Sequence, residues 1–442
     1  MGRAVGAAMV NAVATLAAIA VAIAWTSSPL TVASLVVLAM ACRWAARDIT
    51  GAERRWLIGA FVLAAAARLI VLAVVLLLTD PAREQFHGLT PDGRYAILRS
   101  LIQLNYRLGV EIGPFNRMSL FDGYGNNAFY LYLALVQRLF GPAPYGIVLV
   151  SVCGFLIGAI VMYRVVRADF GPATALGGLV TVLFWPTWFA WSVSMLKESL
   201  QFLLTVTVVW GAVRVMKGGI GGALAFAATG CAIAITITLR SGVVAIPIAG
   251  VLLGLFGLLA ARRPSAALVL AGALAVFAVV GVTRPAAKAR ATEEIRMAVG
   301  RHVGNVRSLG NPYKTADQRL YSDWPESWTT TDRDEGIRFL LRSAVAFVLV
   351  PLPWQVGSFA GLAILPQQFA WYLIVALAIP GVWFGLRAAP QLTMTLAGCC
   401  VAGLIVVAPN SGNIGTLIRH RDMIVPFMAW LGAAGAARIA RG

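Results

Sequence analysis

Long apolar runs separated by short polar turns make up most of this chain of 442 residues. A transmembrane helix needs about 20 mainly apolar residues, and the runs leave room for about twelve such helices. The pattern therefore predicts an all-α polytopic membrane protein. The predicted spans lie near residues 5–25, 29–42, 57–79, 144–163, 173–189, 198–216, 220–238, 242–260, 265–283, 369–386, 392–408 and 423–438.

Three apolar segments need a separate interpretation. We interpret the run at 5–25 as a membrane helix rather than a signal peptide, because it has no clear cleavage site and leads into a second apolar run. The segment Ala128–Phe140 is too short to span, and we expect a helix in the outer membrane interface. Arg338–Val350 is broken by the sequence PLPW, which favours a re-entrant or interfacial helix.

Composition supports the membrane class. Mean hydropathy is +0.81, and only 12% of residues are charged, whereas soluble proteins carry roughly a quarter. The net charge of +18 does not indicate nucleic-acid binding, because its basic residues fall largely in short turns. The positive-inside rule places such turns, and with them both termini, in the cytoplasm. They hold Arg43, Arg47, Arg54, Arg55, Arg164, Arg167, Arg214, Lys217, Arg262, Arg263, Arg387, Arg438 and Arg441.

Acidic residues are concentrated in two polar segments, 80–127 and 284–337, which carry thirteen of the 18 acids. Polar groups without partners are costly in lipid, so both segments are expected to lie in water, on the outer face. The chain then divides into four parts. They are an N-terminal hairpin with a basic turn (1–56), a membrane core with the first outer segment (57–283), a second outer segment (284–368) and the C-terminal helices (369–442).

Ionisable residues beside or inside the apolar runs are candidates for function, because they are expensive there. Asp92, in the sequence TPDGRYA of the first outer segment, is the first candidate. Lys197 and Glu198 stand where one apolar run ends and the next begins, and Arg240 closes another run. Arg68 lies in the middle of a run, where a packing or snorkelling role is the simpler interpretation.

A basic cluster precedes the last span, in the sequence PNSGNIGTLIRHRDMIVPF. It contains Arg419, His420, Arg421 and Asp422, and the predicted topology puts it on the outer side, against the positive-inside rule. Arginine binds phosphate through paired hydrogen bonds, so the cluster indicates a phosphate site. The headgroup of an anionic membrane lipid is the alternative.

No metal site is indicated. All five cysteines lie in or beside apolar runs, and the histidines of the outer segments, His87 and His302, are isolated from other ligands. A divalent metal stays open, and no other cofactor is expected.

The order of these residues resembles the GT-C glycosyltransferases, the superfamily of protein O-mannosyltransferases and lipid A aminoarabinose transferases. In that family an early outer loop holds a key Asp, followed by an aromatic and a small residue, and here Asp92-Gly93-Arg94-Tyr95-Ala96 matches it. The common Asp-Glu pair is Asp92-Gly93 in this chain. The later matches are Phe140-Gly141, Arg164, Arg167, Phe170-Gly171, Pro186, Lys197-Glu198 and, more weakly, the segment around Arg419 and Arg421.

The resemblance implies a GT-C-like fold and transfer of a sugar from a polyprenyl-phosphate donor to a glycan, lipid or protein acceptor. The reaction would take place on the outer face of the cytoplasmic membrane. Asp92 would be the general base, and cations would stabilise the leaving phosphate. The implied phosphate ligands are Arg240, Arg419, Arg421 and Lys197, supported by Arg94, Tyr95, Glu198 and His420.

Three other functions stay open. A transporter or flippase of lipid-linked sugars would also need charges near the membrane, although it predicts them at the midplane together with repeat symmetry. A polysaccharide polymerase of the cell envelope would act on similar lipid-linked glycans. A non-catalytic scaffold of a cell-envelope assembly would need no catalytic acid.

Overall fold

The computed structural model describes residues 28–78, 91–113, 127–141, 146–218, 221–308, 311–322, 329, 331–356 and 359–441. The span expected at 5–25 lies outside these ranges, as do Asp80, Glu84 and Asp122 of the first outer segment. In the described ranges the chain forms helices, turns and loops, with one isolated β-bridge between Pro312 and Asn413. The predicted all-α class is confirmed.

The chain divides into two compact units, which interleave along the sequence. Unit 1 comprises Met1–Val161, Trp188–Leu204 and Thr238–Arg240, and unit 2 comprises Met162–Thr187, Thr205–Ile237 and Ser241–Gly442. The four-part division expected from the sequence concerns membrane topology and stays a prediction.

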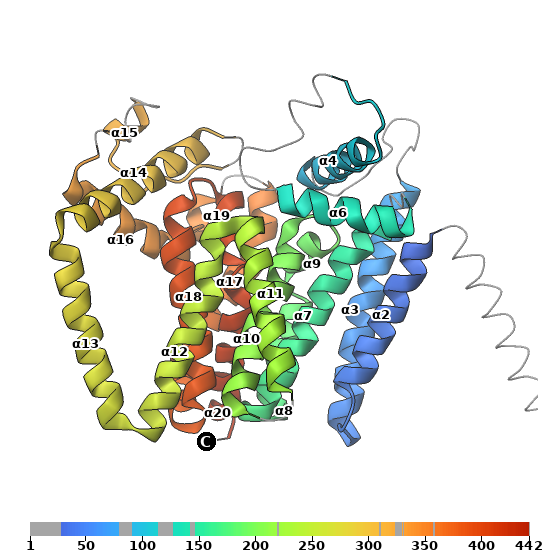
Figure 1. The fold of residues 1–442 in the computed structure, drawn as a ribbon, viewed down its shortest axis with the longest axis horizontal. Helices are drawn as coiled ribbons and strands as arrows, with labels where there is room; N and C mark the ends of the chain where they lie inside the picture. The colour runs from blue at the N-terminus through green and yellow to red at the C-terminus, as the bar shows by residue number, and fades with distance from the viewer. Residues whose placement is uncertain are drawn as a thin grey trace, which may run out of the picture. The chain divides into compact units, whose positions relative to one another are not determined.

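Unit 1 contains two apolar helices, two helices at one end of them, and parts of four others (Figure 1). Its complete helices are α2 (Pro29–Ala45), α3 (Gly51–Leu77), α4 (Pro91–Arg107) and α6 (Asn127–Phe140), joined by parts of α7 (Gly146–Phe170), α9 (Pro186–Ser192), α10 (Lys197–Lys217) and α11 (Gly222–Arg240). α6 is a short helix, as expected from its apolar run.

Close packing of α7 on α10 forms the centre of unit 1. Gly154 and Gly158 are four residues apart on α7, and this spacing of small residues lets two membrane helices approach closely. A Cβ on Gly154 would lie 3.5 Å from the Ser199 carbonyl oxygen of α10, and one on Gly158 would lie 3.0 Å from the Phe202 ring. The Ser151 and Ser199 hydroxyls are hydrogen-bonded at 2.9 Å across the same contact.

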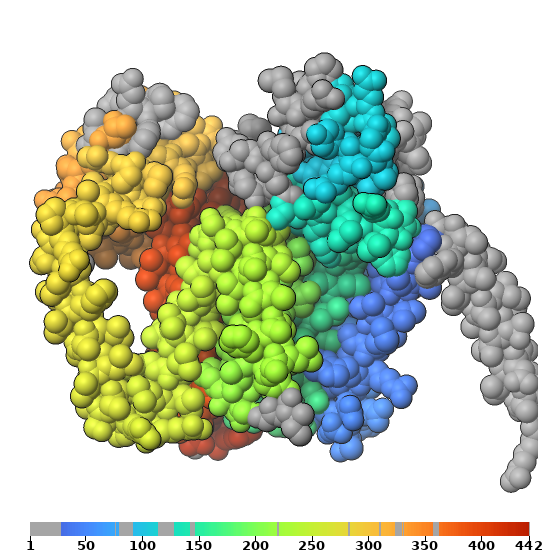
Figure 2. All heavy atoms as spheres, viewed as in Figure 1, coloured from blue at the N-terminus to red at the C-terminus, as the bar shows by residue number. Residues whose placement is uncertain are grey.

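Unit 2 contains the remaining helices. These are α8 (Pro172–Leu183), α12 (Ala245–Arg262), α13 (Pro264–Thr283), α14 (Pro285–Arg307), α15 (Arg319–Ser322), α16 (Arg333–Leu349), α17 (Phe359–Ala388), α18 (Pro390–Val407), α19 (Ile414–Arg421) and α20 (Val425–Ile439), with most of α10 and α11. α12 packs on α18, and α17 packs on α20. α13 stands at the side of this bundle, away from α18, and leads into α14 (Figures 1 and 2).

Seven described helical segments are long and apolar enough to cross a membrane, or eight if the bent pair α8–α9 counts as one span. The chain is therefore a multi-pass membrane protein. One candidate, Gly222–Arg262, is 41 residues long and has the length of two spans. The expected count of about twelve is not confirmed.

Proline sets the beginning of many helices. It has no amide hydrogen to leave unbonded and its φ angle suits the first helical turn. The helices that begin at a proline are α2, α4, α8, α9, α13, α14 and α18. These residues mark short turns that separate apolar runs, and the spans expected at 265–283 and 392–408 agree with α13 and α18 within a few residues. The span expected at 173–189 is instead the bent pair α8–α9, and α17 begins at Phe359, ten residues before the expected start.

The basic turns of unit 2 lie at one end of its helices. Arg262 and Arg263 join α12 to α13, and Arg387 ends α17, while α14, α15, α16 and α19 lie at the opposite end (Figure 1). This separation is the pattern that the positive-inside rule produces.

α16 begins earlier than its apolar run. The Asp332 side chain accepts a hydrogen bond of 2.7 Å from the Glu335 amide, so the helix is capped there and starts at Arg333 instead of Arg338. It ends at Leu349, before the Val350-Pro351 bond, where the sequence predicted a break. The second polar segment, expected as a loop, also contains the 23-residue helix α14.

Glycine contacts between helices give a first prediction. A Cβ on Gly381 of α17 would overlap the Leu431 carbonyl of α20 and lie 3.1 Å from the Gly435 amide nitrogen. We expect Gly381→Ala to reduce the free energy of unfolding by about 1–3 kcal/mol, the usual cost of overpacking. Gly272→Ala on α13 is the control, because nothing lies within 4 Å of its Cβ position. Thermal unfolding in nanodiscs measures both, and equal stability of the two variants would contradict the α17–α20 packing.

Candidate functional site

Asp92 lies in the first turn of α4 and is exposed. α4 packs on α6, where the Tyr95 and Tyr130 rings meet edge to face at 6.2 Å. The Gln137 amide of α6 donates a hydrogen bond of 2.6 Å to the Ser100 hydroxyl of α4. A carboxylate at this end of a helix is stabilised by the positive end of the helix dipole. α6 thus supports a helix that presents Asp92 to solvent.

Arg99 shares the face of α4 that carries Asp92. Tyr95 is three residues after Asp92 and Arg99 is seven residues after it. This spacing places all three on one side of a helix. The Arg99 guanidinium lies 4.9 Å from the centre of the Tyr95 ring and donates to its hydroxyl at 2.7 Å. Arg94 is exposed on a different side of α4. Sequence reasoning missed Arg99, although helical spacing from Asp92 is a signal that would have found it.

Lys197 and Glu198 form the first turn of α10, beside its contact with α7. Glu198 is buried and Lys197 is half-buried. A cavity of about 140 Å³ lies in unit 1 between α6, α7 and α10, and Leu196, which precedes Lys197 in the chain, lines it. Its walls are mainly apolar, and include Phe129, Met195 and Leu200.

Arg240 is the last residue of α11. α10 and α11 approach where a Cβ on Gly211 would lie 2.8 Å from the Ala225 carbonyl oxygen. Gly211 is near the end of α10 and Ala225 near the start of α11, so the two helices run antiparallel. At a rise of about 1.5 Å per residue, Lys197 lies about 21 Å from Gly211 along α10, and Arg240 lies about 22 Å from Ala225 along α11. They therefore lie about equally far along neighbouring helices from this contact, at the same end of both.

Arg68 is fully buried within α3 and is part of the packing of unit 1. Its guanidinium donates to the Ser192 hydroxyl at 2.7 Å and to the Ala64 carbonyl at 3.0 Å. It also lies 4.8 Å from the centre of the Phe155 ring and 4.7 Å from that of Phe189. These contacts fit the packing role expected for this residue.

Arg421 is buried at the end of α19 and donates to three acceptors of unit 2. Its side chain bonds the Phe347 carbonyl at 2.9 Å, the Gln368 side-chain oxygen at 2.6 Å and the Val350 carbonyl at 2.5 Å. The guanidinium also lies 5.1 Å from the centre of the Trp371 ring. A phosphate contact for Arg421 stays a prediction, but its described partners are protein groups.

Three more side chains complete the end of α16. The Trp371 indole donates to the Val348 carbonyl at 3.0 Å. Tyr372 and Gln368 donate to the Leu349 carbonyl at 2.5 and 3.3 Å. The last carbonyls of a helix have no partner within the helix, and here α17 and α19 supply the donors.

His420 and His302 meet one residue, Ser411, from two sides. The Ser411 hydroxyl lies 2.6 Å from Nδ1 of His420, and its carbonyl accepts from Nδ1 of His302. Nε2 of His302 lies 3.0 Å from the Tyr321 hydroxyl. This buried network joins α14, α15 and the segment that leads into α19.

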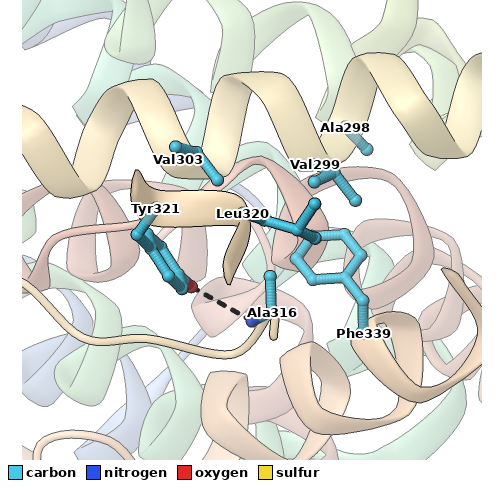
Figure 3. Close-up of a cluster of buried hydrophobic side chains, with 7 residues drawn as sticks. All are labelled: Ala298, Val299, Val303, Ala316, Leu320, Tyr321 and Phe339. Carbon is cyan, nitrogen blue, oxygen red and sulfur yellow. Dashed lines mark hydrogen bonds between the residues drawn. The ribbon is translucent and has the colours of Figure 1, made fainter. Parts of the chain in front are cut away.

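The helices around His302 have their own apolar core. Val299 and Val303 of α14 pack with Leu320 of α15 and Phe339 of α16, and Tyr321 accepts a hydrogen bond of 3.1 Å from the Ala316 amide (Figure 3). We call α14, α15, α16 and residues 311–318 the helical cap.

Backbone pairing ties the helical cap to the segment before α19. The Ile414 amide donates to the Asn311 carbonyl at 2.9 Å, and the Tyr313 amide donates to the Gly412 carbonyl at 3.1 Å. A Cβ on Gly412 would lie 2.8 Å from the Val306 amide nitrogen of α14. Only glycine fits this approach without displacing backbone.

The nine predicted site residues divide between the units. Unit 1 holds Asp92, Arg94, Tyr95, Lys197, Glu198 and Arg240, and unit 2 holds Arg419, His420 and Arg421. Helix lengths put Lys197 and Arg240 about equally far from the contact between α10 and α11. The roles of all nine, and the proximity of Asp92 to Arg419, stay predictions. In the described residues no group of three or more His, Cys, Asp or Glu side chains could hold a metal ion.

Two solved structures are similar to this chain. They are ArnT from Cupriavidus metallidurans in the apo state and the same protein bound to undecaprenyl phosphate, each 15% identical, with TM-scores of 0.46 and 0.44. The alignments cover 87% and 86% of this chain, and the chain spans 60% of the length of each ArnT chain. No known family model and no curated protein matches the sequence. We draw neither fold family nor function from this degree of similarity.

The burial of His302 predicts a pH-dependent stability. Burial lowers the pKa of His302 to about 4, below the unfolded value of about 6.5. The unfolded chain therefore binds a proton first as pH falls, and stability decreases from about pH 6.5 toward pH 4, by about 3 kcal/mol at most. Denaturation across this range, compared between the native chain and His302→Gln, measures the effect. Equal pH slopes would contradict it.

Proposed function

We propose that this chain is a membrane glycosyltransferase of the GT-C type. It transfers a sugar from a polyprenyl-phosphate donor to a glycan, lipid or protein acceptor. The observation that carries the proposal is the composition of unit 1: an exposed carboxylate, Asp92, on a helix outside the apolar spans, together with two cations, Lys197 and Arg240, at the same end of neighbouring helices.

Asp92 is the general base of the proposed reaction. Its carboxylate takes the proton from an acceptor hydroxyl as that oxygen bonds to the anomeric carbon of the sugar. The bond from the anomeric carbon to the phosphate oxygen breaks, and polyprenyl phosphate leaves with the electron pair. Tyr95 and Arg99 share the face of α4 with Asp92 and are available to bind the acceptor.

Cations stabilise the negative charge that develops on the leaving phosphate. Lys197 and Arg240 serve this role in unit 1, and Arg419 is the candidate phosphate ligand of unit 2. Glu198 orients Lys197. The apolar cavity between α6, α7 and α10 accommodates part of the polyprenyl chain. Leu196, the residue before Lys197, is one of its lining residues. The reaction lies on the outer side of the cytoplasmic membrane, opposite the basic turns.

A transporter of lipid-linked sugars is the second candidate. Arg68 favours it, because a fully buried cation within the span α3 is a feature of substrate pathways. The hydrogen bonds of Arg68 to Ser192 and Ala64 and its two aromatic contacts instead describe a packed residue. Turnover separates the two functions, since a transporter leaves the sugar attached to its lipid.

Replacement of Asp92 tests the catalytic assignment. Asp92→Asn should reduce sugar transfer by about 10²–10⁴-fold, the usual contribution of a general base, with donor affinity unchanged. The assay is release of labelled sugar from the polyprenyl-phosphate donor by purified protein. Glu111→Gln is the control, because Glu111 is another exposed acid directly after α4. Full turnover in Asp92→Asn would remove Asp92 as the base.

Replacement of Arg240 tests the phosphate site of unit 1. Arg240→Ala should weaken binding of polyprenyl phosphate about tenfold, a loss of about 1.4 kcal/mol. Arg263→Ala is the control, because Arg263 is exposed in the basic turn after α12. Binding in nanodiscs measures both variants. Equal affinity of Arg240→Ala and the native chain would exclude this arginine as a phosphate ligand.

A further inference from the structure

The two arginines of α19 occupy opposite sides of the helix. Each residue turns an α-helix by about 100°, so Arg419 and Arg421 point about 200° apart. Gly415, Thr416 and Arg419 form the less buried side of α19, whereas Arg421 lies on the buried side. One phosphate on one face of α19 therefore cannot meet both guanidinium groups along the helix surface.

The buried side of α19 is fixed by Arg421. Its guanidinium donates to the Phe347 and Val350 carbonyls at the end of α16 and to the Gln368 side chain of α17. A positive charge near the C-terminal end of a helix is also favoured by the helix dipole. The planar guanidinium matches acceptors in three directions, which a lysine ammonium on its flexible stem does not reproduce.

The ends of α19 are held independently. Before the helix, Asn413 caps it by accepting from the Thr416 amide at 2.7 Å and donates to the Ser308 hydroxyl at 2.8 Å. After the helix, the buried carboxylate of Asp422 accepts a hydrogen bond of 3.1 Å from the Trp185 indole. The ends hold α19 in place along its axis, and Arg421 fixes which side of the helix faces α16 and α17 and therefore the direction of Arg419.

We infer that Arg421 is a positioning residue that aims Arg419 at the donor phosphate and is not itself a phosphate ligand. This inference rests on the proposed function, in which Arg419 binds that phosphate. It assigns the two arginines of the R-x-R sequence different roles: Arg419 supplies charge to the ligand, and Arg421 joins α16, α17 and α19.

Lysine substitutions separate charge from geometry. Binding of polyprenyl phosphate in nanodiscs should weaken at least tenfold in Arg419→Ala and by no more than about threefold in Arg419→Lys, because lysine binds phosphate as a point charge. Arg421→Lys keeps the charge and should still lose about tenfold, because three acceptors lose their matching donors. Arg338→Lys, an exposed substitution on α16, should leave affinity unchanged.

A double-mutant cycle gives the decisive result. If Arg421 acts through Arg419, Arg421→Lys should cost less than about twofold once Arg419 is alanine. A further tenfold loss in the double variant would overturn the positioning role while leaving Arg419 as a phosphate ligand. Unchanged affinity in Arg419→Ala alone would remove the phosphate site of α19 and the positioning role with it.

Gln368→Ala keeps the test independent of the folding of Arg421→Lys. Gln368 bonds one nitrogen of Arg421 and has no charge to offer a phosphate. Its loss should weaken binding about threefold in the native background and by less than about 1.5-fold when Arg419 is alanine. Equal losses in both backgrounds would overturn the inference.

Discussion

Backbone carbonyls at the end of a helix need donors, and the end of α16 shows how strongly this requirement shapes unit 2. An unsatisfied buried carbonyl costs about 1–3 kcal/mol. The carbonyls of Phe347, Val348, Leu349 and Val350 all accept from side chains of α17 or α19. The end of α16 therefore ties α17 and α19 together.

The helical cap extends this constraint from α16 to the segment before α19. His302 bonds the carbonyl of Ser411 and His420 bonds its hydroxyl. Residues 311–313 pair with the backbone around Gly412. The position of α19 is thus determined by protein contacts on several sides. A rigid helix is a suitable support for Arg419, which we propose to bind phosphate with little reorganisation.

Much of the fold could be predicted because membrane helices depend on length, hydropathy and sidedness, all of which are local. The runs near 198–216 and 265–283 correspond to α10 and α13 within a few residues. The early start of α16 depends on one cap at Asp332. The α14 helix lies in a polar segment without an apolar run, so hydropathy alone missed it.

The candidate site was less predictable, because it depends on the direction of side chains. The basic residues at 419–421 indicated one phosphate site. In a helix, however, the two-residue spacing points the Arg419 and Arg421 side chains in nearly opposite directions. The acceptors of Arg421 come from α16 and α17, more than fifty residues earlier in the chain. Such partners are visible only in three dimensions. Arg99, in contrast, could be found from its helical spacing to Asp92.

The interleaving of the two units has a consequence for biosynthesis. Unit 1 needs Trp188–Leu204 and Thr238–Arg240 in addition to its N-terminal part, so the ribosome must pass residue 240 before unit 1 has all its pieces. Helices inserted earlier must wait in the bilayer as separate elements, and their final assembly follows translocation. No single cut separates the two units, because a cut that keeps one unit whole divides the other. Truncated forms are therefore expected to be substrates for membrane quality control.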